Sequence, residues 1–366
     1  MTGNLSELLK EPYAMMKYAA GSQALSGYYG TLELNVSGYP FPGWSSPAER
    51  QAVLELIMPI LIKMRRRNWA FIAEIPELSA GEQKLLMEHG HITGSMVSRR
   101  KGGFVLLNDR QDTECCVNDD EHLYFRSFYP GREGLENACH ELKLMMADFK
   151  KKLNVAHDDT LGYLYSEPLK AGAGIVFSAL LHLPAVRFAR AMDQMDGALG
   201  DMGVFLSPMF PSDTKYDDGN IYHLHSPSVR EGELEYAMEM VQTGAQSLAG
   251  LEKVSMDRLM NTPKSAEQLR RAVRKSYARL TTGKRIKYSD LRAALSMLRL
   301  GLATGILSSS IPEEERTRLL GFAYHENTPA HMKFALSITE SRARREQRAQ
   351  YAKNLILNKL NVSAPD

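Results

Sequence analysis

Residues 118–184 constrain the fold of this chain more than any other stretch. The stretch opens with a polar cluster, Asn118 to His122, which leads into an alternating run from Leu123 to Phe128. It closes with a glycine-rich turn at 172–174 and an apolar run from Ile175 to Pro184. Two polar or glycine-rich turns that each feed a strand, with a helix between them, are a common way for a mixed α and β region to build a site at strand ends. We therefore expect the chemistry of the protein in this stretch.

The segment between the two turns predicts a helix from Glu133 to about Lys151. Its apolar side chains recur at steps of three and four residues, which is typical of a helix that packs one face on a sheet. Glu136, His140 and Lys143 fall on the opposite face, which we expect to meet water. Cys139 lies on the apolar face, so we interpret it as a core residue.

Several short segments around this helix alternate in hydropathy or carry turn signals. They predict an antiparallel meander that includes residues 122–128. A helix at 79–90 begins with the capping box Ser79-x-x-Glu82. The other predicted strands are 31–36, 69–75, 104–107, 115–117, 203–207 and 220–225, and the other predicted helices are 47–67 and 184–199.

From Val229 onward the pattern is helical throughout, with further helices expected at 291–306, 313–324 and 339–360. The change from mixed to purely helical character near Lys253 predicts a domain boundary. We expect a small, mostly helical part at 1–88, a region with a central sheet at 89–253 and a helical domain at 254–366. The predicted fold class is α+β.

Composition excludes several classes of protein. The 45 basic and 43 acidic residues leave a formal charge of +2, so bulk charge favours neither nucleic acid nor an anionic membrane as a partner. Three cysteines, two of them adjacent, fit neither a disulfide framework nor a zinc spacing. The first ten residues lack the apolar core of a signal peptide, and the most apolar run, 171–186, is shorter than the ~20 residues of a membrane span. We expect a cytoplasmic protein without a membrane partner.

Other candidate sites carry weaker signals. His223 and His225 share one face of a strand, but no third ligand stands at a matching spacing, so we expect no metal site. The turn at 171–174 lacks the Lys-Ser of a P-loop. The basic residues 99–101 and those of the last helix lack interleaved aromatic side chains, so we expect no nucleic-acid partner.

Several short motifs in a fixed order give the chain a family resemblance. In the first half they are Gly38-Tyr39-Pro40-Phe41-Pro42, Asn118-Asp119-Asp120-Glu121-His122, Phe128-Tyr129-Pro130-Gly131 and Leu161-Gly162-Tyr163-Leu164. Gly172-x-Gly174 and His182-Leu183-Pro184-Ala185 follow, and the helical part adds Arg274-Lys275-Ser276-Tyr277, Leu298-Arg299-Leu300-Gly301 and Pro329-Ala330-His331. In this order the motifs resemble those of the ATP:guanido phosphotransferases, and within them the bacterial protein-arginine kinases.

The resemblance covers the chain from about residue 25 to its end. It implies a small helical amino-terminal part, a central antiparallel sheet flanked by helices, and a carboxy-terminal helical domain that forms a dimer. A homodimer through residues 254–366 is therefore expected.

The resemblance also implies five arginines that hold ATP, and this chain has another residue at each of those positions. Phosphoryl transfer needs several fixed cations, beside magnesium, to hold three phosphates and spread the developing charge. The corresponding residues here are Tyr29, Thr31, Tyr124, Val176 and, depending on one residue of alignment, Ser207 or Pro208. The family's reactive cysteine corresponds to Glu167, which adds a negative charge.

The acidic half of the implied site is retained. The carboxylates that hold and deprotonate the guanidinium group in the family correspond to Asp120 and Asp213, both shortened from Glu. With their acidic neighbours they predict a pocket that repels nucleotide and attracts a cation; the alternative is that these acids only cap turns and face water. The possible guanidinium-binding residues are Asp119, Asp120, Glu121, Glu167 and Asp213.

The leading functional hypothesis is a catalytically inactive relative of the protein-arginine kinases that needs no cofactor. It would act as a binding or regulatory subunit whose partner is a protein or an arginine-containing peptide. The alternative is an active kinase that uses ATP and magnesium with rearranged cations, for which Arg126, Lys170 and Lys215 are the local candidates. The family's phosphoarginine-reading Arg-Asp pair corresponds to Arg344 and Arg345, so this chain has Arg where the family has Asp.

Overall fold

The structure is a computed structural model that describes residues 5–8, 10, 12–13, 24–64, 68–99, 101–131, 134–210 and 219–363. Asp213 and Lys215 lie outside the described residues. The chain divides into two compact units. Unit 1 comprises Met1–Ala14, Gly27–Ser178 and Ser226–Val241, and unit 2 comprises Met15–Ser26, Ala179–His225 and Gln242–Asp366.

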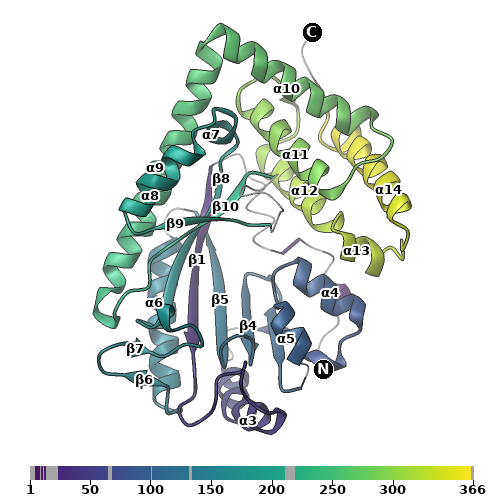
Figure 1. Ribbon diagram of the computed structural model, residues 1–366. Coiled ribbons are helices and arrows are strands. Elements are labelled where there is room, and N and C mark those ends of the chain that lie inside the picture. Colours follow the sequence, from purple (N-terminus) through teal and green to yellow (C-terminus); the bar gives the residue numbers. More distant parts are fainter. Residues whose placement is uncertain are drawn as a thin grey trace. The chain divides into compact units, whose positions relative to one another are not determined.

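Unit 1 is built on an antiparallel sheet, as predicted. The predicted meander is confirmed, because β2, β3, β4 and β5 pair successively antiparallel and β5 then pairs antiparallel with β1. The strands follow the order β2-β3-β4-β5-β1-β8 (Figure 1). They are β1 (Leu25–Leu34), β2 (Trp69–Glu74), β3 (Phe104–Asn108), β4 (Thr113–Val117), β5 (Leu123–Pro130) and β8 (Ile175–His182), of which β8 continues into unit 2.

Helix α6 (Gly134–Lys150) confirms the amphipathic prediction. The apolar side chains of its predicted core face are buried, whereas Glu136, His140 and Lys143 are exposed. The helix lies so close to β1 that a Cβ atom on Gly30 would stand 2.5 Å from Cδ1 of Leu142. Only glycine allows this approach of helix to strand.

The other helices of unit 1 are α1 (Leu5–Leu8), α3 (Pro47–Lys63), α4 (Ala80–Glu88) and α5 (Gly94–Arg99). The predicted capping box of α4 is present, because the Glu82 backbone N–H donates to Ser79 Oγ at 3.3 Å and Ser79 N–H donates to Glu82 at 2.8 Å. Two short strands, β6 (His157–Asp158) and β7 (Gly162–Tyr163), form a separate antiparallel pair.

Unit 2 contains β9 (Phe205–Pro208) and β10 (Ile221–His225), which pair antiparallel with each other. The strand order at this end of the sheet is β8-β10-β9. The remainder of unit 2 is largely helical, as predicted, and Figure 1 shows these helices in teal, green and yellow. They are α7 (Pro184–Phe188), α8 (Met192–Asp201), α9 (Leu234–Asn261, which begins in unit 1), α10 (Pro263–Thr282), α11 (Tyr288–Ala303), α12 (Glu313–Glu326), α13 (Pro329–Phe334) and α14 (Ser341–Asn354).

Two predicted boundaries were wrong. The single helix expected at 184–199 is broken between α7 and α8, because Arg190 adopts a left-handed conformation with φ of 60°. Strand β1 begins at Leu25 rather than at residue 31, where the alternating pattern starts, and its earlier part contains Gly27, which packs closely on Phe128 of β5, and Gly30, which packs closely on Leu142 of α6.

The α+β class is nonetheless as predicted: an antiparallel sheet flanked by helices, then a helical carboxy-terminal region. Across the described part of the chain, no helix is both long enough and apolar enough to span a membrane.

Candidate functional site

The strand register brings the candidate residues of unit 1 onto one face of the sheet. Across β1 and β5, Thr31 lies opposite Arg126 and Glu33 lies opposite Tyr124. Across β4 and β5, Glu114 lies opposite Arg126. Residues directly opposite one another share a face, and so do residues two apart along a strand. The shared face therefore carries Tyr29, Thr31, Glu33, Glu114, Tyr124 and Arg126.

A pocket of about 270 Å³ opens at this face. It joins the sheet to the loop before α5, the turn after β4 and the short helical turn at Pro168–Lys170. It is lined by Glu33, Gly90, His91, Ile92, Thr93, Asp119, Asp120, Glu121, Tyr124, Arg126 and Lys170.

Arg126 is held by the protein's own groups. Its Nη2 atom lies 2.6 Å from Oε1 of the buried Glu114 and donates to the Gly90 carbonyl at 3.1 Å. The second Glu114 oxygen lies 2.6 Å from Nδ1 of His91. Burial alone would lower the pKa of Arg126, but the adjacent Glu114 carboxylate and the neighbouring tyrosines together outweigh burial, so the pKa is raised. The guanidinium group is therefore a fixed cation that is already neutralised.

Tyr29 and Tyr124, which occupy two of the expected arginine positions, flank this guanidinium group. The Arg126 Cζ atom lies 5.4 Å from the Tyr29 ring centre and 6.0 Å from the Tyr124 ring centre, within range of cation–π attraction. Burial raises the pKa of both phenols, so both remain neutral.

The remaining expected arginine positions carry no cation either. Thr31 is buried opposite Arg126, and Val176 lies on β8 outside the residues that line the pocket. Ser207 and Pro208 lie on β9 in unit 2, where the Ser207 hydroxyl and His225 Nε2 are hydrogen-bonded at 2.7 Å.

The turn after β4 is rigid. The Asn118 backbone is left-handed with φ of 57°, and its amide donates to the carbonyls of Arg50 at 2.8 Å and Gly102 at 2.7 Å. The buried His122 ring accepts from Val36 N–H at 3.1 Å and lies 3.0 Å from the Pro40 carbonyl. Burial lowers the pKa of His122 to about 4. These two residues position the turn rather than bind a ligand.

The predicted guanidinium-binding residues differ in how far their carboxylates are already engaged by other groups of the chain. Glu121 is buried and fully engaged, because it accepts from the Asn35 amide at 2.6 Å and from the Ser166 hydroxyl at 2.5 Å. Asp119 accepts from the Thr93 hydroxyl, and burial raises the pKa of its carboxyl to about 6. Asp120 is exposed and lies 3.1 Å from the Arg99 guanidinium.

Glu167 does not line the pocket but is paired with a residue that does. Its Oε2 atom lies 3.2 Å from Lys170 Nζ, and both side chains are about half exposed or more, at 67% and 50%. Burial lowers the pKa of Lys170, whereas Glu167 raises it. The net effect is a raised pKa. The second cation of the pocket is therefore also balanced by a carboxylate of the chain.

The sequence reasoning missed Glu33, Glu114 and His91. Burial raises the pKa of Glu33 to about 7, an effect that Lys170 opposes and the neighbouring carboxylates reinforce. Glu33 could have been identified from the sequence. It lies two residues after Thr31 and four after Tyr29 on one strand, so its side chain shares their face of the sheet. The pocket and its ion-pair partners hold six carboxylates (Glu33, Glu114, Asp119, Asp120, Glu121 and Glu167) and three cations (Arg99, Arg126 and Lys170) among the residues that the structure describes.

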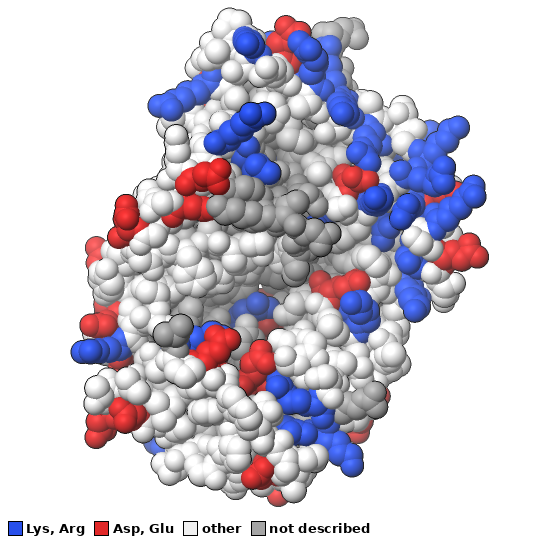
Figure 2. Space-filling view, in the orientation of Figure 1, with Lys and Arg blue, Asp and Glu red and all other residues white. Residues whose placement is uncertain are grey.

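Arg344 and Arg345 lie near the start of α14 in unit 2. Arg344 Nη1 donates to the Ile338 carbonyl at 3.1 Å, and Arg345 is exposed. Figure 2 shows Lys and Arg side chains gathered over this part of unit 2.

A family model for the ATP:guanido phosphotransferase C-terminal catalytic domain matches residues 61–255, more than half of the chain. Among curated proteins, the chain is 24% identical to the protein-arginine kinase of Brevibacillus brevis over 281 residues, which cover 76% of this chain and 77% of the relative. It is 25% identical to the protein-arginine kinase of Shouchella clausii over 282 residues, with coverage of 76% and 77%.

Solved structures support the same fold at low sequence identity. The substrate-free duplicated taurocyamine kinase from Schistosoma mansoni matches with a TM-score of 0.54 and 15% identity, over 77% of this chain and 41% of that longer chain. Lombricine kinase matches with a TM-score of 0.52 and 14% identity, over 66% of this chain and 72% of that one. Sequence motifs, fold and family model agree: the chain belongs to the ATP:guanido phosphotransferase family.

Proposed function

We propose that the protein is a catalytically inactive relative of the protein-arginine kinases that binds an arginine side chain of a protein partner in the unit 1 pocket. One observation carries the proposal. Both cations that line the pocket are paired with carboxylates of the same chain, Arg126 with Glu114 and Lys170 with Glu167. Among the described residues that line the pocket, every Lys or Arg is therefore already paired with a carboxylate when a triphosphate would arrive.

Electrostatics then favours a cationic ligand. A triphosphate would bring several negative charges to a pocket in which carboxylates already outnumber cations, and like charges at close range repel strongly in a partly desolvated site. A guanidinium group has the opposite charge and presents five donors in a plane, which suits carboxylates. Glu33 and Asp119 are the pocket carboxyls whose raised pKa values a bound cation would lower.

The test is calorimetric titration with two peptides that differ only in one side chain, arginine or its neutral isostere citrulline. We expect heat of binding with arginine and none with citrulline. Glu33→Gln and Asp119→Asn should each weaken arginine binding by about ten-fold, since hydrogen bonds to charged groups contribute roughly 1.5–3 kcal/mol. The matched control Glu55→Gln removes an exposed carboxylate of α3 and should leave affinity unchanged.

Equal heats for the two peptides would contradict recognition of the cation. Phosphoarginine formed in a protein substrate with Mg-ATP would contradict inactivity and favour the active-kinase alternative. A homodimer through residues 254–366 and a cytoplasmic location remain part of the proposal. The homodimer rests on the family resemblance, and the location rests on the composition and on the pattern of the sequence.

A further inference from the structure

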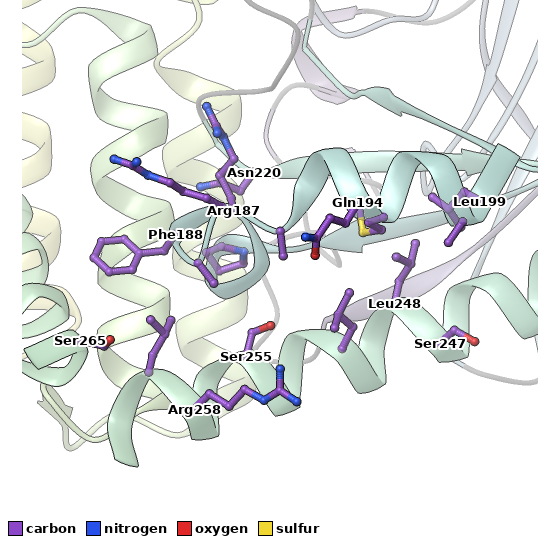
Figure 3. Close-up of a pocket in the computed structure, with 18 of the residues that line it drawn as sticks. Arg187, Phe188, Gln194, Leu199, Asn220, Ser247, Leu248, Ser255, Arg258 and Ser265 are labelled. Carbon is purple, nitrogen blue, oxygen red and sulfur yellow. The ribbon is translucent and has the colours of Figure 1, made fainter. Parts of the chain in front are cut away.

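Unit 2 contains a groove that the proposed function does not use. Its volume is about 1340 Å³, larger than the roughly 300–1,000 Å³ of ordinary small-molecule sites. One wall comes from α7 and α8 and the other from α9, with contributions from α10 and α11 (Figure 3). Gln194 and Leu199 project from α8 toward Leu248 on α9. These dimensions suit a segment of another protein rather than a metabolite.

The floor of the groove is apolar and adaptable. Met195, Leu199, Leu248 and Leu259 are buried at its base, and Met202 and Met297 also line it. Methionine side chains are flexible and polarisable, and they are common where a surface must accommodate a helix. The small side chains of Ala189, Ala191 and Ala198 leave room for a backbone to approach.

The charge of the groove has a single sign. The residues that line it include three arginines, Arg187, Arg190 and Arg258, and no Asp or Glu. All three arginines are exposed, and Figure 3 shows Arg187 and Arg258 on opposite walls. Since cations on both rims flank an apolar floor, the complementary ligand has apolar residues along one face and carboxylates on both flanks.

The walls are braced in advance of any ligand. The buried Glu252 carboxylate on α9 accepts from the backbone N–H groups of Ala185 at 2.7 Å and Val186 at 2.9 Å, which ties α9 to α7. Arg190 is left-handed at the end of α7, where Ala191 N–H donates to the Val186 carbonyl at 3.1 Å. A non-glycine residue in this conformation is strained, and such positions cluster at binding sites.

The groove follows α9 from Ser247 to Leu259. That distance is about 18 Å at ~1.5 Å per residue, which corresponds to a helix of roughly 12–15 residues. Free helices of this length are marginal in water, so the ligand would fold as it binds. We propose that this groove docks an acidic amphipathic helix of a partner protein. The inference goes beyond the proposed function and is independent of the proposed arginine pocket, since it uses only residues of unit 2.

The experiment measures fluorescence anisotropy of a labelled helical peptide of about 15 residues, with leucines at i, i+3, i+4 and i+7 and glutamates on both flanks. Two controls keep its length: a scrambled peptide of the same composition, and a peptide with lysine in place of each glutamate. We expect saturable binding of the acidic amphipathic peptide alone, weakening as salt increases. Equal binding of the scrambled or the lysine peptide would overturn the proposal, as would no binding of any peptide.

Variants locate the site. Arg190→Glu with Arg258→Glu should weaken binding about ten-fold or more, because a charge reversal at a rim replaces attraction by repulsion. The matched control, Lys253→Glu with Arg270→Glu, changes the same charge at exposed residues of α9 and α10 outside the groove. Ala198→Glu, at an exposed groove position, should also weaken binding. This single variant keeps the test valid if the double variant misfolds. Equal loss in the control, or none in the groove variants, would contradict the assignment.

Sedimentation of the variants without peptide tests whether a second copy of the chain, rather than a partner helix, occupies the groove. If Arg190→Glu with Arg258→Glu, or Ala198→Glu, changes the mass of the particle, the groove is covered by a second copy of the chain and the proposal is wrong. An unchanged mass together with lost peptide binding supports it.

Discussion

Arg126 illustrates how one side chain limits what the unit 1 pocket can bind. It lies on the same face as Tyr29, Thr31 and Tyr124, three of the expected arginine positions. Its charge is neutralised by Glu114, and the rings of Tyr29 and Tyr124 lie beside it. A cation in this state cannot approach a phosphate without first leaving a buried partner. The pocket therefore contains an arginine without offering one to a ligand.

Glu114→Gln tests this ion pair. Removing one partner of a buried pair leaves the other charge uncompensated, so we expect the free energy of unfolding to fall by about 3 kcal/mol. Urea denaturation measures the loss. The exposed pair Arg271–Glu267 provides the control, since Glu267→Gln should cost less than about 0.5 kcal/mol. A Glu114→Gln variant as stable as the control variant would show that Arg126 is not held in this way.

Glu33 should make the proposed arginine binding depend on pH. Its pKa of about 7 lies above the ordinary value, so the carboxyl is largely protonated at pH 6 and largely ionised at pH 8. Because the guanidinium group binds the ionised form, affinity should rise roughly ten-fold from pH 6 to pH 8, as expected when one group must lose a proton.

Titration of the arginine peptide across this range, with Glu33→Gln alongside, measures the effect. In the variant the rise above pH 7 should disappear, and only the contribution of Asp119, whose pKa is about 6, should remain. An affinity that falls with pH, or the same profile in both proteins, would contradict the role of Glu33.

At the scale of single elements, α6 supports the strands that carry the pocket. Leu142 is fully buried against Gly30 of β1, whereas Leu144 of the same helix is 51% exposed. Leu142→Ala should therefore lower the free energy of unfolding by about 2–5 kcal/mol, the range for a buried leucine. Leu144→Ala has the same chemistry and should cost less than about 0.5 kcal/mol. Thermal or urea unfolding of the pair distinguishes a helix packed on β1 from one packed elsewhere.

The elements that sequence predicted well were those with strong local signals. Helix α6 and the capping box of α4 follow from spacing and cap chemistry, which are local properties. The start of β1 was missed because Gly27 and Gly30 disfavour a strand locally and are explained only by contacts with Phe128 and α6, far away in sequence. Hydrophobic periodicity likewise could not reveal the left-handed residue Arg190, which ends α7.

The pocket was partly predictable for the same reason. Asp119, Asp120 and Glu121 lie in a motif and were identified from it. Their different roles were not, because the Asn35 and Ser166 groups that engage Glu121 come from other parts of the chain. The ion pair between Glu114 and Arg126 depends on the register between β4 and β5, which neither strand specifies alone.

At the scale of the whole molecule, we expect two chains in solution. Sedimentation equilibrium should give twice the chain mass of 41.0 kDa. Hydrogen exchange at decreasing protein concentration should then show protection that is lost within residues 254–366 and retained elsewhere. A single-chain mass at tens of micromolar, or loss of protection outside that range, would contradict the proposed dimer.

The central claim is that this member of the family has exchanged a triphosphate site for a cation site. Calorimetric titration of the purified protein with Mg-ATP and, separately, with the arginine peptide tests it most directly. We expect no heat of binding for millimolar Mg-ATP and saturable binding of the arginine peptide. Saturable micromolar binding of Mg-ATP that is lost in Lys170→Ala would contradict it.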